Sequence, residues 1–132
     1  MSVAYVLALP IAWNREAHAR SAGLRTYPMV ALATCAMMLI GINVLSSTGA
    51  ESRVMQAIIT GMGFIGGGAI LKSGKRITGL ATASSLWATG AMGIAVAWQR
   101  YEMAVLLSLM TFATLQFVSP AKKLVENNQK ED

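Results

Sequence analysis

The chain has 132 residues, of which 55% are hydrophobic and 13% charged, with a mean hydropathy of +0.52 and a formal net charge of +5. Soluble domains carry roughly 25% charged residues, so this composition excludes a small soluble globule and a disordered chain. The single cysteine, Cys35, excludes a disulfide scaffold, and the composition indicates a membrane protein.

Five runs without Asp, Glu, Lys, Arg or His occupy residues 1–13, 27–45, 54–71, 77–98 and 103–118. A helix needs roughly 20 residues to cross the hydrocarbon layer. The second, third and fourth runs meet that length, the fifth is slightly short, and the first needs tilt or local thinning of the bilayer. We therefore predict an all-α integral membrane bundle of about five transmembrane helices over residues 1–118, the first helix short, and a polar cytoplasmic tail over residues 119–132.

Basic residues alternate between rich and poor connections along the chain. The poor connections hold Arg53 and Arg100, whereas the rich ones and the tail hold three each: Arg15, Arg20 and Arg25; Lys72, Lys75 and Arg76; Lys122, Lys123 and Lys130. The positive-inside rule then predicts an N-terminus outside and a C-terminus in the cytoplasm. Charge in separate loops also argues against a nucleic-acid partner. Contact with anionic lipids is the alternative role for these loops.

The first run has a competing interpretation as a cleaved signal peptide, because Ala17-His18-Ala19 has the form of a cleavage site. No Lys or Arg precedes the apolar run, which opposes that interpretation. Further along the chain, Thr26 is predicted to cap the second helix, with Pro28 in its first turn. Lys72-Ser73-Gly74 is predicted to end the third helix.

Small residues predict where helices pack in lipid, because association there depends on close backbone approach. The fourth helix carries Ala81, Ser85, Thr89, Gly93 and Ala97, and the third carries Gly61, Gly63, Gly66, Gly67 and Gly68. We predict that these two helices form the tightly packed centre of the bundle. The alternative is that the glycines form a groove for a helix of another protein. Predicted interhelical hydrogen-bonding residues are Asn43, Gln56, Thr60 and Thr82.

The sequence contains no convincing catalytic motif. Gly61-Met62-Gly63-Phe64-Ile65-Gly66 matches a dinucleotide-binding pattern but lacks the preceding strand and the later acidic residue. His18 is the single histidine, Cys35 lies within an apolar run, and the runs contain no carboxylate for a hard cation. We predict no enzymatic activity, no cofactor and no bound metal, and a carrier acting alone is disfavoured.

Three segments in a fixed order carry a family resemblance. GLRT at residues 23–26, QAIITGMGFIGGGAIL at 56–71 and GLATASSLW at 79–87 resemble the membrane domain of the MgtC/SapB family. The resemblance implies a bacterial inner-membrane protein of about five helices, in a family associated with magnesium limitation, acid stress and survival inside host cells. It also implies a regulator that binds other membrane proteins, including the F-type ATP synthase, rather than a magnesium pump.

The chain departs from the family pattern in two segments. Where the family usually has Gly-x-Glu-Arg, this chain has Ala12-Trp13-Asn14-Arg15, so the acidic residue is lost. At the start of the fourth helix, Ala81 stands where the family often has Asn or Thr. The sequence ends at Asp132 without the soluble domain of some relatives, so we expect a short form. The short first run also suggests a truncated start.

Three functional hypotheses follow. The first is a non-enzymatic regulator or adaptor whose third and fourth helices engage a membrane partner through Gly61, Gly63, Gly66, Gly67, Gly68, Thr82, Ser85 and Trp87. Its cytoplasmic face would comprise Arg15, Arg20, Arg25, Lys72, Lys75 and Arg76. The second is a small Mg²⁺ transporter or channel component acting as a homo-oligomer. The third is a membrane fragment without activity.

Overall fold

The computed structural model describes residues 1–18, 22–45, 47–73 and 76–118. Its elements, in chain order, are α1 (Ser2–His18), α2 (Thr26–Val44), α3 (Thr48–Gly68), β1 (Leu71–Ser73), β2 (Arg76–Thr78), α4 (Leu80–Ala97), α5 (Tyr101–Ala113) and a π-helical turn, η1 (Thr114–Val118). The predicted all-α class is confirmed, with one short hairpin added. The predicted tail at residues 119–132 lies outside the described residues, as do Arg20 and Lys75.

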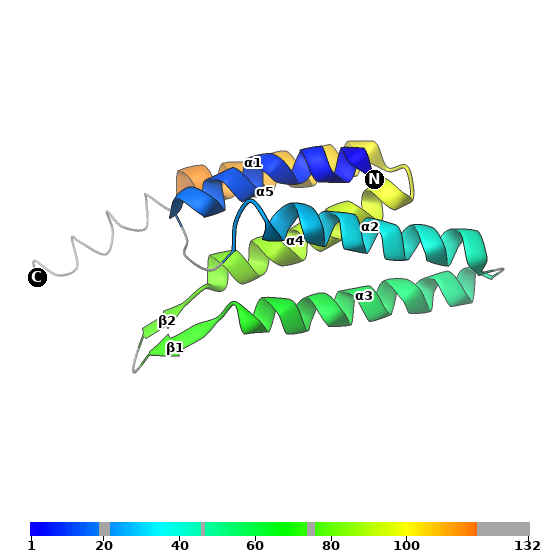
Figure 1. Ribbon diagram of the computed structural model, residues 1–132, viewed down its shortest axis with the longest axis horizontal. Helices are drawn as coiled ribbons and strands as arrows, with labels where there is room; N and C mark the ends of the chain where they lie inside the picture. The colour runs from blue at the N-terminus through cyan, green and yellow to red at the C-terminus, as the bar shows by residue number, and fades with distance from the viewer. Residues whose placement is uncertain (19–21, 46, 74–75, 119–132) are drawn as a thin grey trace, which may run out of the picture.

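Successive helices run in opposite directions, so their connections lie at alternate ends of the bundle (Figure 1). The α1–α2 connection, the β1–β2 hairpin and the end of η1 share one end, which we call the hairpin end. Arg25 and Lys72 lie there and are exposed. The connections that are rich in basic residues therefore lie at the hairpin end, and those that are poor in them lie at the other end.

Helix α4 is the centre of the bundle, because it contacts all four other helices and contacts α2 most extensively. Helix α3 lies at the edge, and its buried residues are Ile58, Met62 and Gly66, which form a single stripe. The predicted central pair of third and fourth helices is therefore wrong, and the central pair is α2 and α4. The glycines of α3 predicted close packing against another helix. Glycine is equally compatible with a helix face that has no neighbour, which is what most of α3 has.

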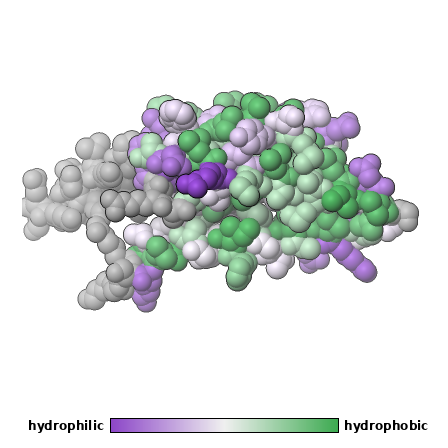
Figure 2. Space-filling model, in the orientation of Figure 1, coloured by the Kyte–Doolittle hydropathy of each residue, from purple (hydrophilic) through white to green (hydrophobic). Residues whose placement is uncertain are grey.

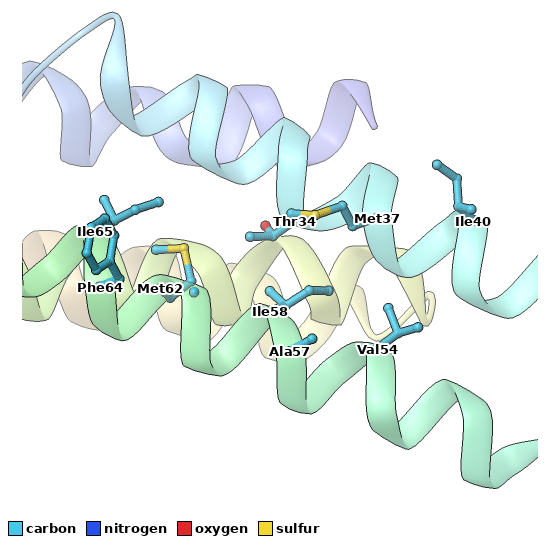
Figure 3. A pocket seen from close by; sticks show the side chains of 10 residues that line it. Thr34, Met37, Ile40, Val54, Ala57, Ile58, Met62, Phe64 and Ile65 are labelled. Atoms are coloured by element: carbon cyan, nitrogen blue, oxygen red, sulfur yellow. The ribbon is translucent and has the colours of Figure 1, made fainter.

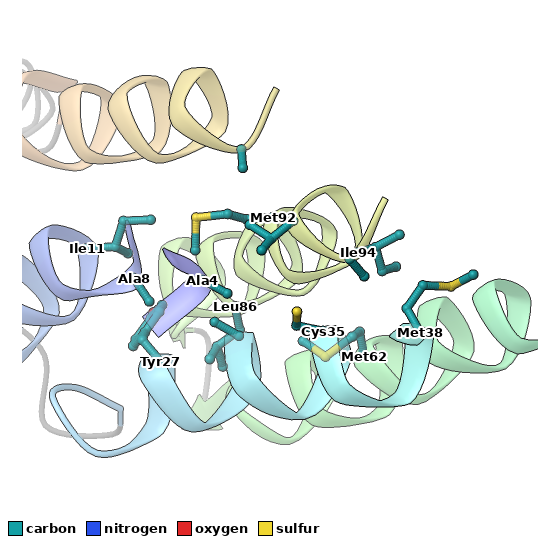
Figure 4. Close-up of a cluster of buried hydrophobic side chains, with 14 of the residues drawn as sticks. Ala4, Ala8, Ile11, Tyr27, Cys35, Met38, Met62, Leu86, Met92 and Ile94 are labelled. Carbon is teal, nitrogen blue, oxygen red and sulfur yellow. The ribbon is translucent and has the colours of Figure 1, made fainter. Parts of the chain in front are cut away.

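The core lies where α1, α2 and α4 meet (Figure 4). Helix α1 contributes Ala4, Ala8 and Ala12, spaced so that small side chains face the bundle on successive turns, with Ile11 beside them. Tyr27 and Met92, from α2 and α4, are the large residues that fill the space beside them, and both are fully buried. Small residues on α1 thus permit close approach, and large residues opposite them supply the buried apolar area.

The β1–β2 hairpin replaces the predicted C-terminal turns of the third helix. Helix α3 ends at Gly68, four residues before Lys72, and β1 pairs antiparallel with β2 so that Lys72 lies opposite Ile77. Three successive glycines each cost roughly 1 kcal/mol relative to alanine in a helix, which favours an early end. Gly79 then begins α4 with a φ of +89°, and any Cβ there would overlap the Ala69 carbonyl.

The start of α2 also differs in detail from the prediction. Thr26 is the first residue of the helix, and the preceding residue, Arg25, makes no side-chain capping bond. The predicted capping role of Thr26 is therefore wrong, whereas Pro28 does lie in the first turn, where its missing N–H is harmless. Helix α3 has the capping bond that α2 lacks, since Ser47 Oγ accepts from the Ala50 N–H at 3.3 Å.

The outer surface of the bundle is apolar over most of its length (Figure 2). Large hydrophobic side chains point outward from every helix, including Phe64, which is 86% exposed, and Val44 and Phe117, each 72% exposed. Hydrophilic residues gather mainly toward the two ends in the same view. This distribution is the reverse of a water-soluble protein and suits contact with lipid.

Candidate functional site

A buried polar cluster joins α1, α2 and α4 near the hairpin end. Arg15 Nη2 donates to Thr82 Oγ1 at 3.1 Å, and the Tyr27 hydroxyl lies 2.6 Å from Ser85 Oγ. Ser85 Oγ also donates to the Thr82 carbonyl at 3.0 Å, so the four residues form one connected network. Buried polar groups in a low-dielectric interior stabilise only when they are paired. The cluster therefore fixes how the first turns of α2 and α4 meet the last turn of α1.

Arg15 lies in α1 and is 8% exposed, which corrects its predicted place in an exposed basic loop. The helix continues past the uncharged run to His18, because arginine and glutamate are good helix formers, and Arg15 is buried because it has a hydrogen-bond partner inside the bundle. That partner, Thr82, is 67 residues away in the sequence. Arg25 and Lys72 remain exposed at the hairpin end, and Arg76 lies in β2.

A second polar contact links α1 to the end of the last helix. Asn14 Nδ2 donates to Gln116 Oε1 at 2.6 Å, and Ser108 Oγ donates to the Leu7 carbonyl at 2.7 Å. Two buried atoms beside this contact have no hydrogen-bond partner, Asn14 Oδ1 and Arg15 Nε. Asn14, at the position where the resemblance implies an acidic residue, is thus next to an incompletely paired guanidinium.

Neighbouring helices occupy the space beside Gly90 and Gly93 of α4. A Cβ on Gly93 would lie 2.7 Å from the Ala31 carbonyl oxygen and 3.1 Å from the Cys35 nitrogen, which is too close for any side chain. A Cβ on Gly90 would lie 2.9 Å from Met62 Cγ. Gly93 therefore lets α4 approach the α2 backbone directly, which is the close contact that membrane helices use in place of a hydrophobic driving force.

The glycines of α3 behave in the opposite way. A Cβ on Gly66 would meet the Ala83 carbonyl oxygen at 3.5 Å, an ordinary contact with α4. The others have no neighbouring atom within 4 Å of such a Cβ: Gly61, Gly63, Gly67 and Gly68. The structure therefore places one of the five predicted packing glycines of α3 against a helix and leaves four facing open space.

One side of α3 combines small and polar residues and points away from the bundle. Gln56, Thr60, Gly63 and Gly67 recur at helical spacing and are all exposed, opposite the buried stripe of α3. We call these four residues the outward face of α3. Thr60 Oγ1 donates to the Gln56 carbonyl of its own helix at 2.9 Å. Of the predicted interhelical hydrogen-bonding residues, Thr82 makes that contact, whereas Asn43 donates within its own helix.

The remaining predicted partner-binding residues, Thr82, Ser85 and Trp87, all lie on α4. Thr82 and Ser85 are buried in the polar cluster, so they hold the bundle together and are not free to bind a partner. Trp87 is 48% exposed on the side of α4 that borders α3. No group of three or more His, Cys, Asp or Glu residues capable of holding a metal ion occurs in the described part of the chain.

An apolar groove separates the middle of α2 from α3 (Figure 3). Its volume is about 660 Å³, and it is lined by Thr34, Met37, Ile40, Val54, Ala57, Ile58, Gly61, Met62, Phe64 and Ile65. No sequence pattern predicted a groove between these two helices. It exists because α3 touches the bundle along a single stripe.

Five helices with an apolar exterior define the class as a polytopic helical membrane protein, and α2 and α4 are each long and apolar enough to span a membrane. The profile of the MgtC family matches residues 1–124. The chain belongs to the MgtC family, as the resemblance in its three segments predicted. No solved structure matches the chain at a significant level.

Curated relatives extend the comparison. The chain is 32% identical over 113 residues to the putative magnesium transporter YhiD of Escherichia coli K12, which covers 80% of this chain and 53% of that protein. It is 30% identical over 127 residues to the uncharacterized protein slr0014 of Synechocystis, covering 96% and 54%. It is 29% identical over 123 residues to the protein MgtC of Brucella abortus, covering 93% and 51%. The chain spans about half the length of these relatives.

Proposed function

We propose that this chain is a non-enzymatic regulator or adaptor of the bacterial inner membrane that binds another membrane protein under magnesium limitation or acid stress. The observation that supports the proposal most directly is the outward face of α3. Gly63 and Gly67 there have no neighbour, whereas Gly90 and Gly93 of α4 are occupied by other helices. A second helix can approach the α3 backbone closely along this face.

The polar residues of the same face support the proposal independently. Gln56 is exposed on the side of α3 that faces away from the bundle, where an unpaired amide is costly in lipid. Interhelical hydrogen bonds from such side chains contribute about 0.6 kcal/mol on average in membranes, and up to about 1–2 kcal/mol. A partner helix would therefore gain both backbone contact at Gly63 and Gly67 and a polar contact at Gln56.

The proposed orientation places the hairpin end in the cytoplasm, with the N-terminus outside. The positive-inside rule supports it, because the basic-rich connections share that end. Arg25 and Lys72 then belong to a cytoplasmic face available to a partner or to anionic lipids. The family resemblance makes the membrane subunits of the F-type ATP synthase the first partner to test.

The experiment is site-specific photocrosslinking from Thr60 in native membranes, with the full chain expressed in its bacterial host. We expect a crosslinked heterologous membrane protein, including an F-type ATP synthase subunit, that is lost in Gly63→Leu and Gly67→Leu. Gly68→Leu is the matched control, because Gly68 also faces open space but lies on a different side of α3. Unchanged crosslinking with both glycines replaced would contradict the proposal.

A growth assay links the contact to the physiological role. Deletion of the gene is expected to impair growth at limiting Mg²⁺ or at acidic pH, with rescue by the wild-type chain and by Gly68→Leu but not by Gly63→Leu. Normal growth of the deletion strain in both conditions would remove the stress role.

The alternative function is an oligomeric component of an Mg²⁺ transporter or channel. The relative named a putative magnesium transporter favours it. In that case crosslinks from Thr60 would join copies of this chain, and purified protein in vesicles would admit Mg²⁺ to an entrapped indicator. A heterologous crosslink without Mg²⁺ entry would favour the adaptor.

A further inference from the structure

The groove between α2 and α3 continues to the hairpin end of the bundle. A second hollow of about 450 Å³ is lined by Arg25, Thr26, Met29, Val30, Ala33, Thr34, Met37, Met62 and Ile65. It shares four residues with the groove of Figure 3: Thr34, Met37, Met62 and Ile65. The two hollows therefore form one continuous channel along α2, with a charged residue at one end and apolar residues along the rest.

The length of this channel matches one leaflet of a bilayer. Arg25 and Ile40 lie fifteen residues apart, which is about 22 Å along a helix at 1.5 Å per residue. One leaflet, with its headgroups, is roughly 20–22 Å thick. The channel thus begins at headgroup depth at Arg25 and extends about as far as one lipid molecule does.

The far end of the channel is closed by contact between the two helices. A Cβ on Gly41 would lie 3.2 Å from Val54 Cγ1, so α2 and α3 touch directly beyond Ile40. A partner helix that crosses the whole membrane needs an open path of roughly 30 Å. Closure at Gly41 and Val54 therefore favours an occupant confined to one leaflet, which is a lipid rather than a transmembrane segment.

The open end has the chemistry of a phosphate site. The Arg25 side chain is exposed at the mouth, Thr26 belongs to the lining, and both residues lie at the N-terminal end of α2. The backbone N–H groups of Thr26 and Tyr27 already donate to the Gly23 carbonyl. The anion would therefore be bound by the Arg25 guanidinium, which offers paired donors to phosphate oxygens. Charge at the mouth and apolar walls beyond it are complementary to a phospholipid with an anionic headgroup.

We propose that this channel binds one anionic phospholipid from the leaflet at the hairpin end, with its phosphate at Arg25 and an acyl chain between α2 and α3. The lipid fills the space that α3 leaves beside α2 and holds α3 at its position on the edge of the bundle. This inference does not depend on the partner contact at the outward face, which lies on another side of α3.

The test measures lipid selectivity of the purified full chain reconstituted in phosphatidylcholine vesicles. Spin-labelled phosphatidylglycerol and phosphatidylcholine report the motionally restricted lipid by electron paramagnetic resonance. We expect restriction of phosphatidylglycerol about fivefold stronger than of phosphatidylcholine, since one basic residue near the surface contributes about 1 kcal/mol. An excess of inorganic phosphate is expected to leave this signal unchanged, because the acyl chain supplies part of the binding.

Two pairs of variants separate the headgroup from the chain. Arg25→Gln should reduce the selectivity toward unity, whereas Arg25→Lys and Arg53→Gln, the latter on an exposed arginine at the other end, should retain it. Ala57→Phe fills the channel and should release restricted lipid of both kinds, whereas Val105→Phe on the exposed side of α5 should not. Each variant is compared only when its helical circular dichroism matches the wild type.

Several outcomes would overturn the proposal. Equal restriction of the two lipids by the wild type would remove the headgroup site, as would full selectivity in Arg25→Gln. Unchanged restriction in Ala57→Phe would show that no chain occupies the channel. Competition by inorganic phosphate would make Arg25 a free-anion site, and a photocrosslink from Met37 to another polypeptide would assign the channel to a protein segment.

Discussion

Arg15 on the last turn of α1 donates a hydrogen bond of 3.1 Å to Thr82 on the first turn of α4, although 67 residues separate them. Within the described part of the chain, this hydroxyl is the hydrogen-bond acceptor of the guanidinium, and Arg15 Nε has no partner. A buried cation is costly unless it is paired. The Thr82 hydroxyl therefore has a larger role in stability than its size suggests.

Thr82→Val is expected to destabilise the bundle by about 1–3 kcal/mol, because it leaves the buried guanidinium without this acceptor. The measurement is the free energy of unfolding in detergent, followed by circular dichroism. Thr60→Val is the matched control, since Thr60 is exposed and bonds to its own helix. Equal stability of the two variants would show that the Arg15–Thr82 bond contributes nothing.

Gly93→Ala and Gly63→Ala are expected to have opposite effects. A methyl group at Gly93 would collide with the α2 backbone at Ala31, which costs about 1–3 kcal/mol as overpacking. The same methyl group at Gly63 meets no atom within 4 Å and raises helix propensity, so stability should rise by up to about 1 kcal/mol. Unfolding of the two variants under identical conditions gives the comparison, and a stabilised Gly93→Ala would contradict the observed α2–α4 contact.

The Asn14–Gln116 pair predicts a strong non-additivity between two substitutions. Gln116→Leu alone leaves the buried Asn14 amide unpaired and should cost about 1–3 kcal/mol, whereas the double variant Asn14→Leu/Gln116→Leu should be nearly neutral. A double-mutant cycle on unfolding free energies measures the coupling. Additive costs would mean that the two amides do not interact in the folded chain.

Cysteine accessibility tests the proposed orientation. In a Cys35→Ala background, Gly49→Cys is expected to react with a membrane-impermeant maleimide added to whole cells. Lys72→Cys is expected to react only after the membrane is opened, because the hairpin end would face the cytoplasm. Both sites are exposed in the structure, so burial does not explain a difference. Labelling of both positions from the same side would contradict the proposed topology.

Local patterns were enough to predict the helices but not their arrangement. Uncharged runs located all five helices, and Pro28 marked the start of α2, because both signals depend on a few neighbouring residues. Burial of Arg15 could not be predicted, since the charge alone favours a loop and its acceptor, Thr82, is distant in sequence. The position of α3 at the edge was also missed, because glycines in a membrane helix are compatible with either tight packing or an open face.

The candidate site was predicted in part. Gly63 and Gly67 were among the five predicted packing glycines, and the structure adds that Gln56 and Thr60 share their face. The channel from Arg25 to Ile40 had no sequence signal, because its walls come from two helices whose separation depends on how α3 meets α4. The sequence shows which residues each helix carries, but it does not show the angle between two helices, and that angle determines whether a cavity forms.

The contact between Asn14 and Gln116 also constrains how the protein is made. Helix α1 leaves the ribosome before α5, and its polar partners at Ser108 and Gln116 are synthesised about a hundred residues later. Until then α1 must remain in the membrane with its Asn14 amide unpaired, or be held by the insertion machinery. Assembly of this bundle is therefore a late event in translation, completed only when the last helix arrives beside the first.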